Sequence, residues 1–249
     1  MGRRKKSHQS HGTAQRPRLW GKHAVAAALD NPDRKVLKAW ATRDAAAMMQ
    51  FPAEVAVTLA DVADLGRLVP HDAAHQGLVV EVEPLDEVWL DELLTGAGEQ
   101  AVLLVLDQVT DPHNVGEILR TAAAYALDGI VTTERHSPAM TGVLAKAASG
   151  GLEHVPIVTV VNLARALETL GKRGYLRVGL DSEGPRSLED EVLSKPLALV
   201  LGAEGKGLRR LSRENCDVLA RIDMPGAIKS LNVSNACAVA LTIARLKLR

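Results

Sequence analysis

Three stretches in the C-terminal half of the chain carry polar residues in patterns that could do chemistry. The first covers residues 106–120 and reads Leu-Asp-Gln-Val-Thr-Asp-Pro-His-Asn-Val-Gly-Glu-Ile-Leu-Arg. An apolar run ends here, Pro112 turns the chain, and we expect a helix to begin near Val115. Asn114 then lies near the N-cap, where it could satisfy free backbone N–H groups or hold a ligand, and Arg120 lies about one turn into the helix. Arg120 could equally be an ordinary surface ion-pair residue.

The second stretch is rich in glycine. Residues 202–207, Gly-Ala-Glu-Gly-Lys-Gly, directly follow the apolar run 197–201. Glycines let the backbone approach a ligand closely or turn with positive φ. The pattern is neither a phosphate-binding GxxxxGK[ST] loop nor a dinucleotide-binding GxGxxG placed after a first strand. A plain turn between a strand and a helix is the alternative, but such a turn needs no carboxylate like that of Glu204.

The third stretch joins a loop to the last helix. Residues 222–236 read Ile-Asp-Met-Pro-Gly-Ala-Ile-Lys-Ser-Leu-Asn-Val-Ser-Asn-Ala, and Pro225 and Gly226 mark the loop. Ser230 or Asn232 could cap the helix that follows. Polar side chains beside the free N–H groups of a helix N-terminus also make a ready ligand site.

Short apolar runs and helical stretches alternate through residues 101–249, and these elements must position the three stretches. The expected strands are 102–106, 129–131, 155–161, 176–180 and 197–201, and the expected helices are 115–126, 139–148, 163–172 and 208–216. Apolar strands alternating with helices predict an α/β fold with a parallel sheet covered on both faces. Ligands bind beyond the carboxyl ends of such strands, so we expect the loops after Leu106, Leu201 and Ile222 to carry the site.

The N-terminal part predicts a second, smaller unit. Its expected helices are 23–29, 44–49 and 61–68, and its expected strands are 36–41, 55–59 and 77–82. The acidic stretch that follows predicts a linker with one short helix. We therefore divide the chain into a disordered basic arm (1–18), a small α/β domain (19–83), a linker (84–100) and a larger α/β domain (101–249).

Composition narrows the possible partners. Hydrophobic residues make up 47% and aromatic residues 2%, so the core must consist of Ala, Val and Leu, and aromatic base-stacking platforms are not expected. The net charge is zero, yet seven basic residues precede the first acidic one, Asp30. They are Arg3, Arg4, Lys5, Lys6, Arg16, Arg18 and Lys22. Such an arm is suited to binding a polyanion, because Lys and Arg release counterions from phosphates. The alternative is that the arm is simply a solvated tail.

The two cysteines argue against a disulfide or a metal site. Cys216 and Cys237 form no CxxC and have no His at metal-ligand spacing, which is typical of a protein in the reducing cytoplasm. No apolar run approaches the length of a membrane span, so a membrane is not an expected partner.

Taken together, the three stretches resemble the motifs of the SpoU/TrmH family of S-adenosylmethionine-dependent RNA 2′-O-ribose methyltransferases. The patterns D-P-x-N-x-G-x-x-x-R, G-x-E-G-x-G and S-L-N-V-S are complete at residues 111–120, 202–207 and 230–234. One position departs from the family, since Asp223 stands where a Pro is usual in the loop of the third motif. Residues 21–29 and 75–77 also resemble pieces of the substrate-binding domain found in one branch of the family.

The resemblance implies a fold and a set of roles. The fold would be a C-terminal parallel-sheet SPOUT methyltransferase domain with a deep trefoil knot, plus a small N-terminal α/β (L30e-like) substrate-binding domain. Backbone groups of Gly202, Ile222 and Leu231 would contact S-adenosyl-L-methionine, and no metal would be needed. Arg120 would help to remove the ribose proton. The remaining residues expected to hold the ribose and shape the pocket are Asn114, Glu204, Ser230 and Asn232.

The family resemblance also implies a homodimer with sites near its interface and RNA, not DNA, as the substrate. Because of its N-terminal domain, the leading hypothesis is methylation of a guanosine in 23S rRNA. A tRNA guanosine methyltransferase is the alternative, although its usual form lacks this domain. A non-catalytic RNA-binding or ribosome-assembly protein is a further one, but the intact set of Asn114, Arg120, Glu204 and Asn232 argues against it.

Overall fold

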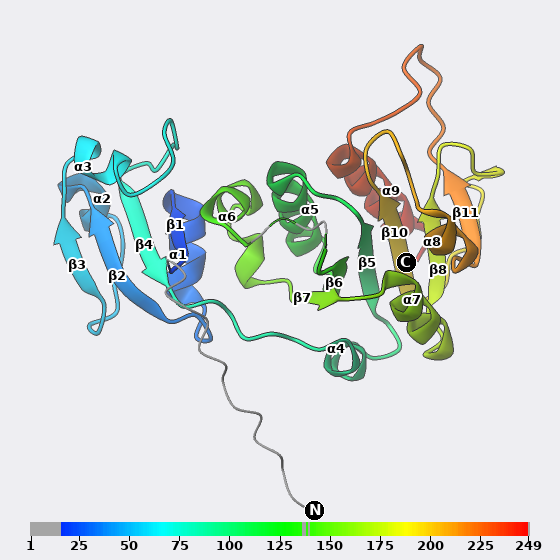
Figure 1. Cartoon of the computed structure of the whole chain (residues 1–249), viewed down its shortest axis with the longest axis horizontal. Helices are drawn as coiled ribbons and strands as arrows, with labels where there is room; N and C mark the ends of the chain where they lie inside the picture. The colour runs from blue at the N-terminus through cyan, green and yellow to red at the C-terminus, as the bar shows by residue number, and fades with distance from the viewer. Residues whose placement is uncertain (1–15, 136–137, 139, 249) are drawn as a thin grey trace, which may run out of the picture.

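The protein contains two β-sheets, one in each half of the chain, which lie side by side along the long axis of the molecule (Figure 1). The computed structural model describes residues 16–135, 138 and 140–248. Most of the predicted basic arm, residues 1–15, lies outside the described residues. Arg18, which we assigned to the arm, instead begins the first strand, and its Nη1 donates a hydrogen bond to the carbonyl oxygen of Leu68 at 3.0 Å.

The N-terminal unit is a four-stranded sheet with order β1-β4-β2-β3. Strand β4 runs antiparallel to β1 and β2, whereas β3 runs parallel to β2. The first of these strands is too short to produce a recognisable period, which is why we did not predict it. The elements are β1 (Arg18–Trp20), α1 (Lys22–Asp30), β2 (Val36–Ala41), α2 (Arg43–Ala47), β3 (Ala56–Leu59), α3 (Val62–Gly66) and β4 (Leu78–Val82).

The C-terminal unit is a seven-stranded sheet with order β7-β6-β5-β10-β8-β11-β9, in which every pair of neighbours is parallel. This confirms the predicted α/β class. Helix α4 (Leu90–Ala97) lies in the linker before the sheet. The other elements are β5 (Val102–Asp107), α5 (Pro112–Ala124), β6 (Gly129–Thr133), α6 (Gly142–Ala148), the 3₁₀ turn η1 (Gly151–Glu153), β7 (Ile157–Val160), α7 (Leu163–Lys172), β8 (Leu176–Leu180), β9 (Arg186–Ser187), β10 (Leu197–Gly202), α8 (Arg210–Glu214), β11 (Val218–Arg221) and α9 (Val233–Lys247).

Helices cover both faces of this sheet, as the apolar strands predict. Successive residues of a strand point to opposite faces. On β5, Leu104 and Leu106 belong to a buried cluster that includes residues of α5 and α9. Leu103 and Val105 belong to a second cluster that includes residues of α4 and α7. The central strands are therefore buried on both sides, and only their ends and loops are available for chemistry.

Helix α5 begins three residues earlier than we expected. Asp111 is its N-cap, with Oδ1 accepting a hydrogen bond from the backbone N–H of His113 at 2.9 Å, and Pro112 occupies the first helical position. Proline is favoured there because its missing N–H would have no partner within the helix anyway. Asn114 therefore lies inside the first turn and is not a cap, and Arg120 lies about two turns into the helix rather than one.

The order of the strands carries the chain back into the middle of the sheet. Strand β10 lies between β5 and β8, and α9 packs beside β5 and β10 through the shared buried cluster. The threading of the chain into a trefoil knot stays a prediction from the family. In the part of the chain that the structure describes, none of the helices is long and apolar enough to cross a membrane.

Candidate active site

The first two motif loops leave the same edge of the sheet. Strand β5 ends at Asp107 and β10 ends at Gly202, and these two residues pair in the parallel register. The third loop follows β11, which ends at Arg221 on the same side because all these strands are parallel. The prediction that the carboxyl ends bring the three loops to one place is therefore confirmed by the sheet.

Asn232 joins the three motifs through one side chain. Its Oδ1 accepts a hydrogen bond from the N–H of Ser234 at 2.8 Å and caps α9, so the cap is Asn232 rather than Ser230. Its Nδ2 donates to Oδ1 of Asn114 at 2.9 Å and to Oε1 of Glu204 at 2.6 Å. A single amide thus links the first turn of α5, the glycine loop after β10 and the start of α9.

A hydroxyl beside this amide extends the network to α5. Ser234 is buried, and its Oγ lies 2.6 Å from Oε2 of Glu117 and 2.6 Å from Oδ1 of Asn232, either of which can accept its proton. Carboxylates are stabilised near a helix N-terminus, where free N–H groups carry partial positive charge. We did not predict a role for Glu117 or Ser234. Ser234 belongs to the third motif, which was a signal, whereas nothing in the sequence singles out Glu117.

The glycine loop folds back on itself. The N–H of Gly207 donates to the carbonyl oxygen of Ala203 at 2.9 Å, and a Cβ at Gly202 would lie only 2.1 Å from the carbonyl carbon of Gly207. Gly205 and Gly207 have φ values of 74° and 63°, and a Cβ at either would meet nothing within 4 Å. The loop therefore offers bare backbone on an open side, which suits contact with the edge of a flat ring.

A buried carboxylate fixes the far end of the glycine loop. Asp107 is fully buried, and it accepts hydrogen bonds from the backbone N–H of Arg209 at 2.9 Å and from its Nε at 2.6 Å. A buried charge needs such pairing to offset its lost hydration. We did not predict this pair, because only the fold brings the end of β5 to the start of α8.

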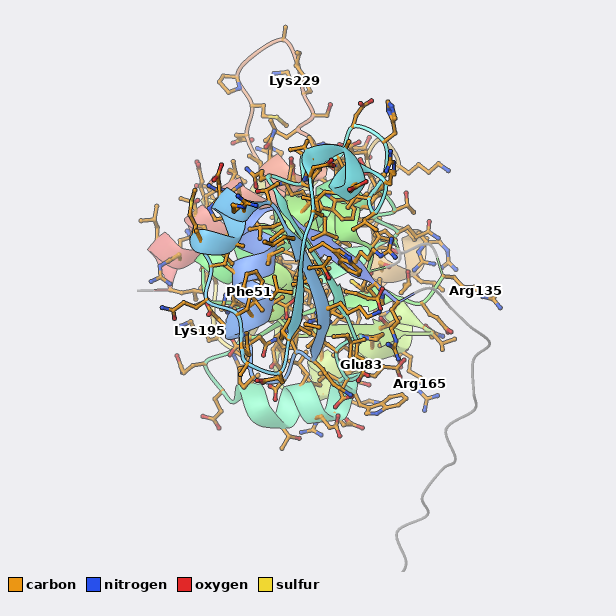
Figure 2. The ribbon with its side chains drawn as sticks, turned by 90° about the vertical axis from the view of Figure 1, so that its left-hand side faces the viewer. Phe51, Glu83, Arg135, Arg165, Lys195 and Lys229 are labelled. Carbon is orange, nitrogen blue, oxygen red and sulfur yellow. The ribbon has the colours of Figure 1, made fainter. Side chains whose placement is uncertain are left out.

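The loop between β11 and α9 projects from the body of the protein, with Lys229 near its tip (Figure 2). Lys229 Nζ donates to the carbonyl oxygen of Met224 at 2.7 Å. Asp223, which stands where the family usually has Pro, forms a 2.7 Å ion pair with Nε of Arg221. The same guanidinium also donates to the carbonyl oxygens of residues 184 and 185, so the pair anchors the base of the loop.

Among the described residues, the other predicted site residues form no side-chain hydrogen bond with the network around Asn232. Ile222 is half-buried, whereas Leu231 is 39% exposed and Ser230 is exposed. Arg120 is exposed on α5, and among the described residues its side chain has no hydrogen-bond or ion-pair partner. An unpaired guanidinium on the motif helix is available to a substrate.

The glycine of the first motif has a packing role. A Cβ at Gly116 would lie 2.5 Å from the Cβ of Ala147 and 2.7 Å from the carbonyl oxygen of Leu144. Helix α5 therefore approaches α6 closely only because position 116 has no side chain. This close contact holds the turn that carries Asn114.

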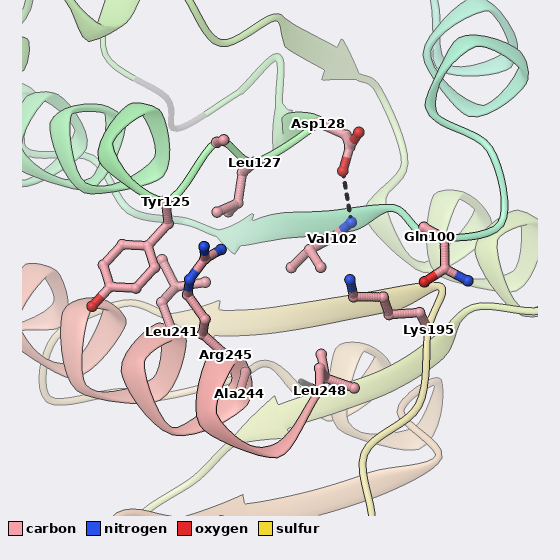
Figure 3. A pocket seen from close by; sticks show the side chains of 11 residues that line it. Gln100, Val102, Tyr125, Leu127, Asp128, Lys195, Leu241, Ala244, Arg245 and Leu248 are labelled. Carbon is pink, nitrogen blue, oxygen red and sulfur yellow. Dashed lines mark hydrogen bonds between the residues drawn. The ribbon is translucent and has the colours of Figure 1, made fainter.

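A cavity of about 330 Å³ lies at the other end of β5, away from the motif residues (Figure 3). Val102, the first residue of β5, lines it together with Tyr125, Lys195 and Arg245. Asp128 also lines it and accepts a hydrogen bond from the N–H of Val102 at 2.8 Å. None of the three motifs contributes a side chain to this cavity.

Neither cysteine is suited to redox or metal chemistry. Burial raises the pKa of both Cys216 and Cys237 to about 12, so both thiols stay protonated at neutral pH. Within the described residues, no group of three or more His, Cys, Asp and Glu side chains is placed to hold a metal ion.

Comparison with known proteins agrees with this architecture. The model of the SpoU rRNA Methylase family matches residues 101–242. The chain therefore belongs to the SpoU rRNA methylase family.

Among its relatives, the 23S rRNA (guanosine-2′-O-)-methyltransferase RlmB of Pseudomonas putida is 39% identical over 239 residues, which cover 92% of this chain and 95% of the relative. The RlmB of Ralstonia nicotianae is 42% identical, covering 90% of this chain and 92% of the relative. The SpoU methyltransferase AviRb of Streptomyces viridochromogenes, solved in complex with AdoMet, has the same fold, with a TM-score of 0.78 at 22% identity over 93% of this chain and 91% of that one.

Proposed function

We propose that this protein transfers a methyl group from S-adenosyl-L-methionine to the ribose 2′-hydroxyl of a guanosine in 23S rRNA. The observation that carries the proposal is that the side chain of Asn232 forms hydrogen bonds with those of Asn114 and Glu204. Each of the three residues comes from a different family motif. The RlmB relatives support the choice of substrate, because they are similar over both units of the chain rather than over the methyltransferase part alone.

The residues around the glycine loop suit S-adenosyl-L-methionine. Bare backbone at Gly202–Gly207 can match the edge of an adenine with N–H and C=O groups. Ile222 and Leu231 offer apolar surface on the neighbouring loop. When bound, the cofactor supplies an already activated methyl group, so the protein needs no metal for this transfer.

What the protein must add is positioning and help with a proton. The residues that orient the ribose are Asn114, Glu204, Ser230 and Asn232. Hydrogen bonds hold three of them, Asn114, Glu204 and Asn232, in place relative to one another. Arg120 lies on α5 six residues beyond Asn114, and it assists removal of the proton from the 2′-hydroxyl. A free guanidinium has too high a pKa to act as a base, so we assign its action to a joint contact with an RNA phosphate.

We further propose that the protein acts as a homodimer in the cytoplasm. Val239 and Leu246 are 37% and 57% exposed on α9, and they lie seven residues apart on one face of this helix. Their exposure supports an apolar contact with a second copy along the middle and C-terminal part of α9. Size-exclusion chromatography with light scattering measures the mass directly.

The activity is tested with RNA that lacks the modification. Total RNA from a strain without this gene is incubated with the protein and methyl-tritiated S-adenosyl-L-methionine, with no added metal. The label should enter 23S rRNA, and mapping of ribose methylation should place it on one guanosine. Label confined to tRNA would overturn the substrate, and binding of NAD or ATP without binding of S-adenosylhomocysteine in calorimetry would overturn the cofactor.

A further inference from the structure

The N-terminal unit lies against the C-terminal unit through α1 and β1, which contact α6 and η1 (Figure 1). A cleft of about 740 Å³ lies between the two units, and linker residues 84–88 are among those that line it. Direct contacts between the units come from α1, β1 and the residues next to them.

A buried ion pair joins the end of α1 to the C-terminal unit. Arg34 and Glu153 are 4% and 2% exposed at their side chains, and Nη2 of Arg34 lies 2.9 Å from Oε1 of Glu153. Arg34 Nε also donates to Oε2 of Glu153 at 3.0 Å, which makes the contact two-pronged. Nδ2 of Asn31 donates to the same Oε2 at 2.8 Å, and Arg34 Nη1 donates to the carbonyl oxygen of Glu83 at 2.8 Å.

Such a pair resists separation. Arg and Glu are almost never fully buried unless they are paired. Here the planar guanidinium of Arg34 has the right geometry to bind both oxygens of the Glu153 carboxylate. Asn31 donates a further hydrogen bond to this carboxylate, and the carbonyl oxygen of Glu83 accepts one from Arg34. Substituting one of the two residues would leave the other charge buried without its partner as long as the units stay packed, which is strongly destabilising.

The other end of α1 is tied to α6 of the C-terminal unit. Oε1 of Gln76 accepts hydrogen bonds from the backbone N–H of Lys22 at 3.0 Å and from Nζ of Lys146 on α6 at 2.8 Å. Gln76 has a φ of 55°, a left-handed conformation that costs energy for a residue with a side chain. The strained residue lies where the two weak N-terminal motifs, residues 21–29 and 75–77, come together.

Between these ends, small residues let the two units touch closely. A Cβ at Gly142 of α6 would lie 1.9 Å from a ring atom of Trp20 and 2.2 Å from the carbonyl oxygen of Arg18. A Cβ at Gly150 would lie 2.9 Å from the Cβ of Ala27 on α1. The two units therefore approach this closely only because positions 142 and 150 have no side chain.

We propose that α1 docks the N-terminal unit onto the methyltransferase unit as one rigid body, and that Arg34 and Glu153 are a positioning pair that keeps the bound RNA in place for methyl transfer. The inference rests on the proposed function, in which the N-terminal unit holds the RNA. Docking fixes the distance between the RNA-binding surface and the methyl donor. The pair therefore affects the rate of methyl transfer in the RNA-bound complex and not the affinity for RNA.

The test compares Arg34→Met and Glu153→Gln with Lys35→Met in the full chain. Lys35 also pairs with a glutamate, Glu83, at 3.0 Å, but its side chain is 66% exposed, so it is a matched control for loss of one charge. Small-angle scattering measures the docking, filter binding measures the affinity for a 23S rRNA fragment, and single-turnover assays measure methyl transfer.

Both interface variants should give a larger radius of gyration. They should bind the RNA within about threefold of the unmodified protein but transfer the methyl group roughly 10- to 100-fold more slowly, because a misplacement of about an ångström costs that much. Affinity for S-adenosylhomocysteine should be unchanged, and Lys35→Met should match the unmodified protein. The double variant should be no slower than either single variant, because the two residues act as a pair.

Several outcomes would overturn the docking proposal. Unchanged scattering and transfer in Glu153→Gln would do so, even if Arg34→Met failed to fold, because the two residues belong to different units. A loss that arises entirely from weaker RNA binding would also overturn the positioning role. If the unmodified protein failed to methylate 23S rRNA, the proposed function would fall, whereas the scattering comparison would still decide whether the units are docked.

Discussion

Asn232 performs two jobs that two substitutions can separate. Its Oδ1 caps α9, and its Nδ2 joins Asn114 to Glu204. Asn232→Ser keeps an oxygen that can cap the helix but removes the bridging amide. Asn232→Ala removes both. The pair of variants therefore distinguishes helix capping from the assembly of the site.

The structure gives the expected size of each effect. Loss of an N-cap costs about 1 kcal/mol. Loss of the bridge leaves the oxygen of the buried Asn114 without its donor, at a cost of about 1–3 kcal/mol. We expect Asn232→Ser to lose roughly 1–3 kcal/mol of unfolding free energy and Asn232→Ala roughly 2–4 kcal/mol. For a chain of this size, the difference of about 1 kcal/mol lowers the Tm of the alanine variant by a further 2–4 °C, approximately.

The assays are calorimetric unfolding and transfer of a tritiated methyl group to RNA. Both variants should lose turnover by a similar factor, because both lose the amide, although their stabilities differ. Asn235→Ser is the control, since Asn235 is exposed in the same turn and has no hydrogen-bond partner among the described side chains. A serine variant with normal turnover would refute the bridging role of Asn232, and equal Tm values for the two variants would refute its capping role.

Three further predictions follow from burial and packing. Arg120→Ala should lower turnover by about 100-fold or more, while unfolding free energy changes by less than about 0.5 kcal/mol because the side chain is exposed; retained activity on a defined RNA would contradict its role. Gly116→Ala should destabilise the protein by about 1–3 kcal/mol in urea titrations, because the new Cβ would lie 2.5 Å from a side-chain atom on α6. Gly96→Ala, where a Cβ meets nothing within 4 Å, should be neutral or stabilising and is the matched control. At pH 8, Cys216 and Cys237 should resist iodoacetamide in the native protein, since a pKa of about 12 leaves roughly one thiol in ten thousand ionised; rapid labelling seen by mass spectrometry would contradict this.

The parts of the fold that were predictable are those with a local signal. Residues 163–172 and 176–180 coincide with α7 and β8, because a helix with one apolar face and a buried strand each leave a recognisable pattern. The meeting of the three motif loops was also predictable, since parallel strands align their carboxyl ends. The roles of Arg120, Ser230 and the residues assigned to the cofactor stay predictions.

What the sequence did not reveal are contacts between residues far apart in the chain. Asp107 and Arg209 are polar residues at ordinary loop positions, and only the adjacency of β5 and β10 makes them partners. Arg34 and Glu153 have no motif around them that predicts an ion pair, because their burial depends on how the two units pack. The start of α5 was placed too late because Asp111 and Pro112 together were a stronger start signal than Val115.

The order of the sheet also constrains how the protein can be made. Strand β5 pairs with β6, which follows it closely, but its other edge belongs to β10, which begins only at Leu197. While the ribosome is still producing the segment between them, the apolar run Val102–Asp107 has one open edge that offers unpaired N–H and C=O groups. A chain that stalls before residue 197 would therefore expose an aggregation-prone strand, and chaperone demand should fall abruptly once β10 has been synthesised.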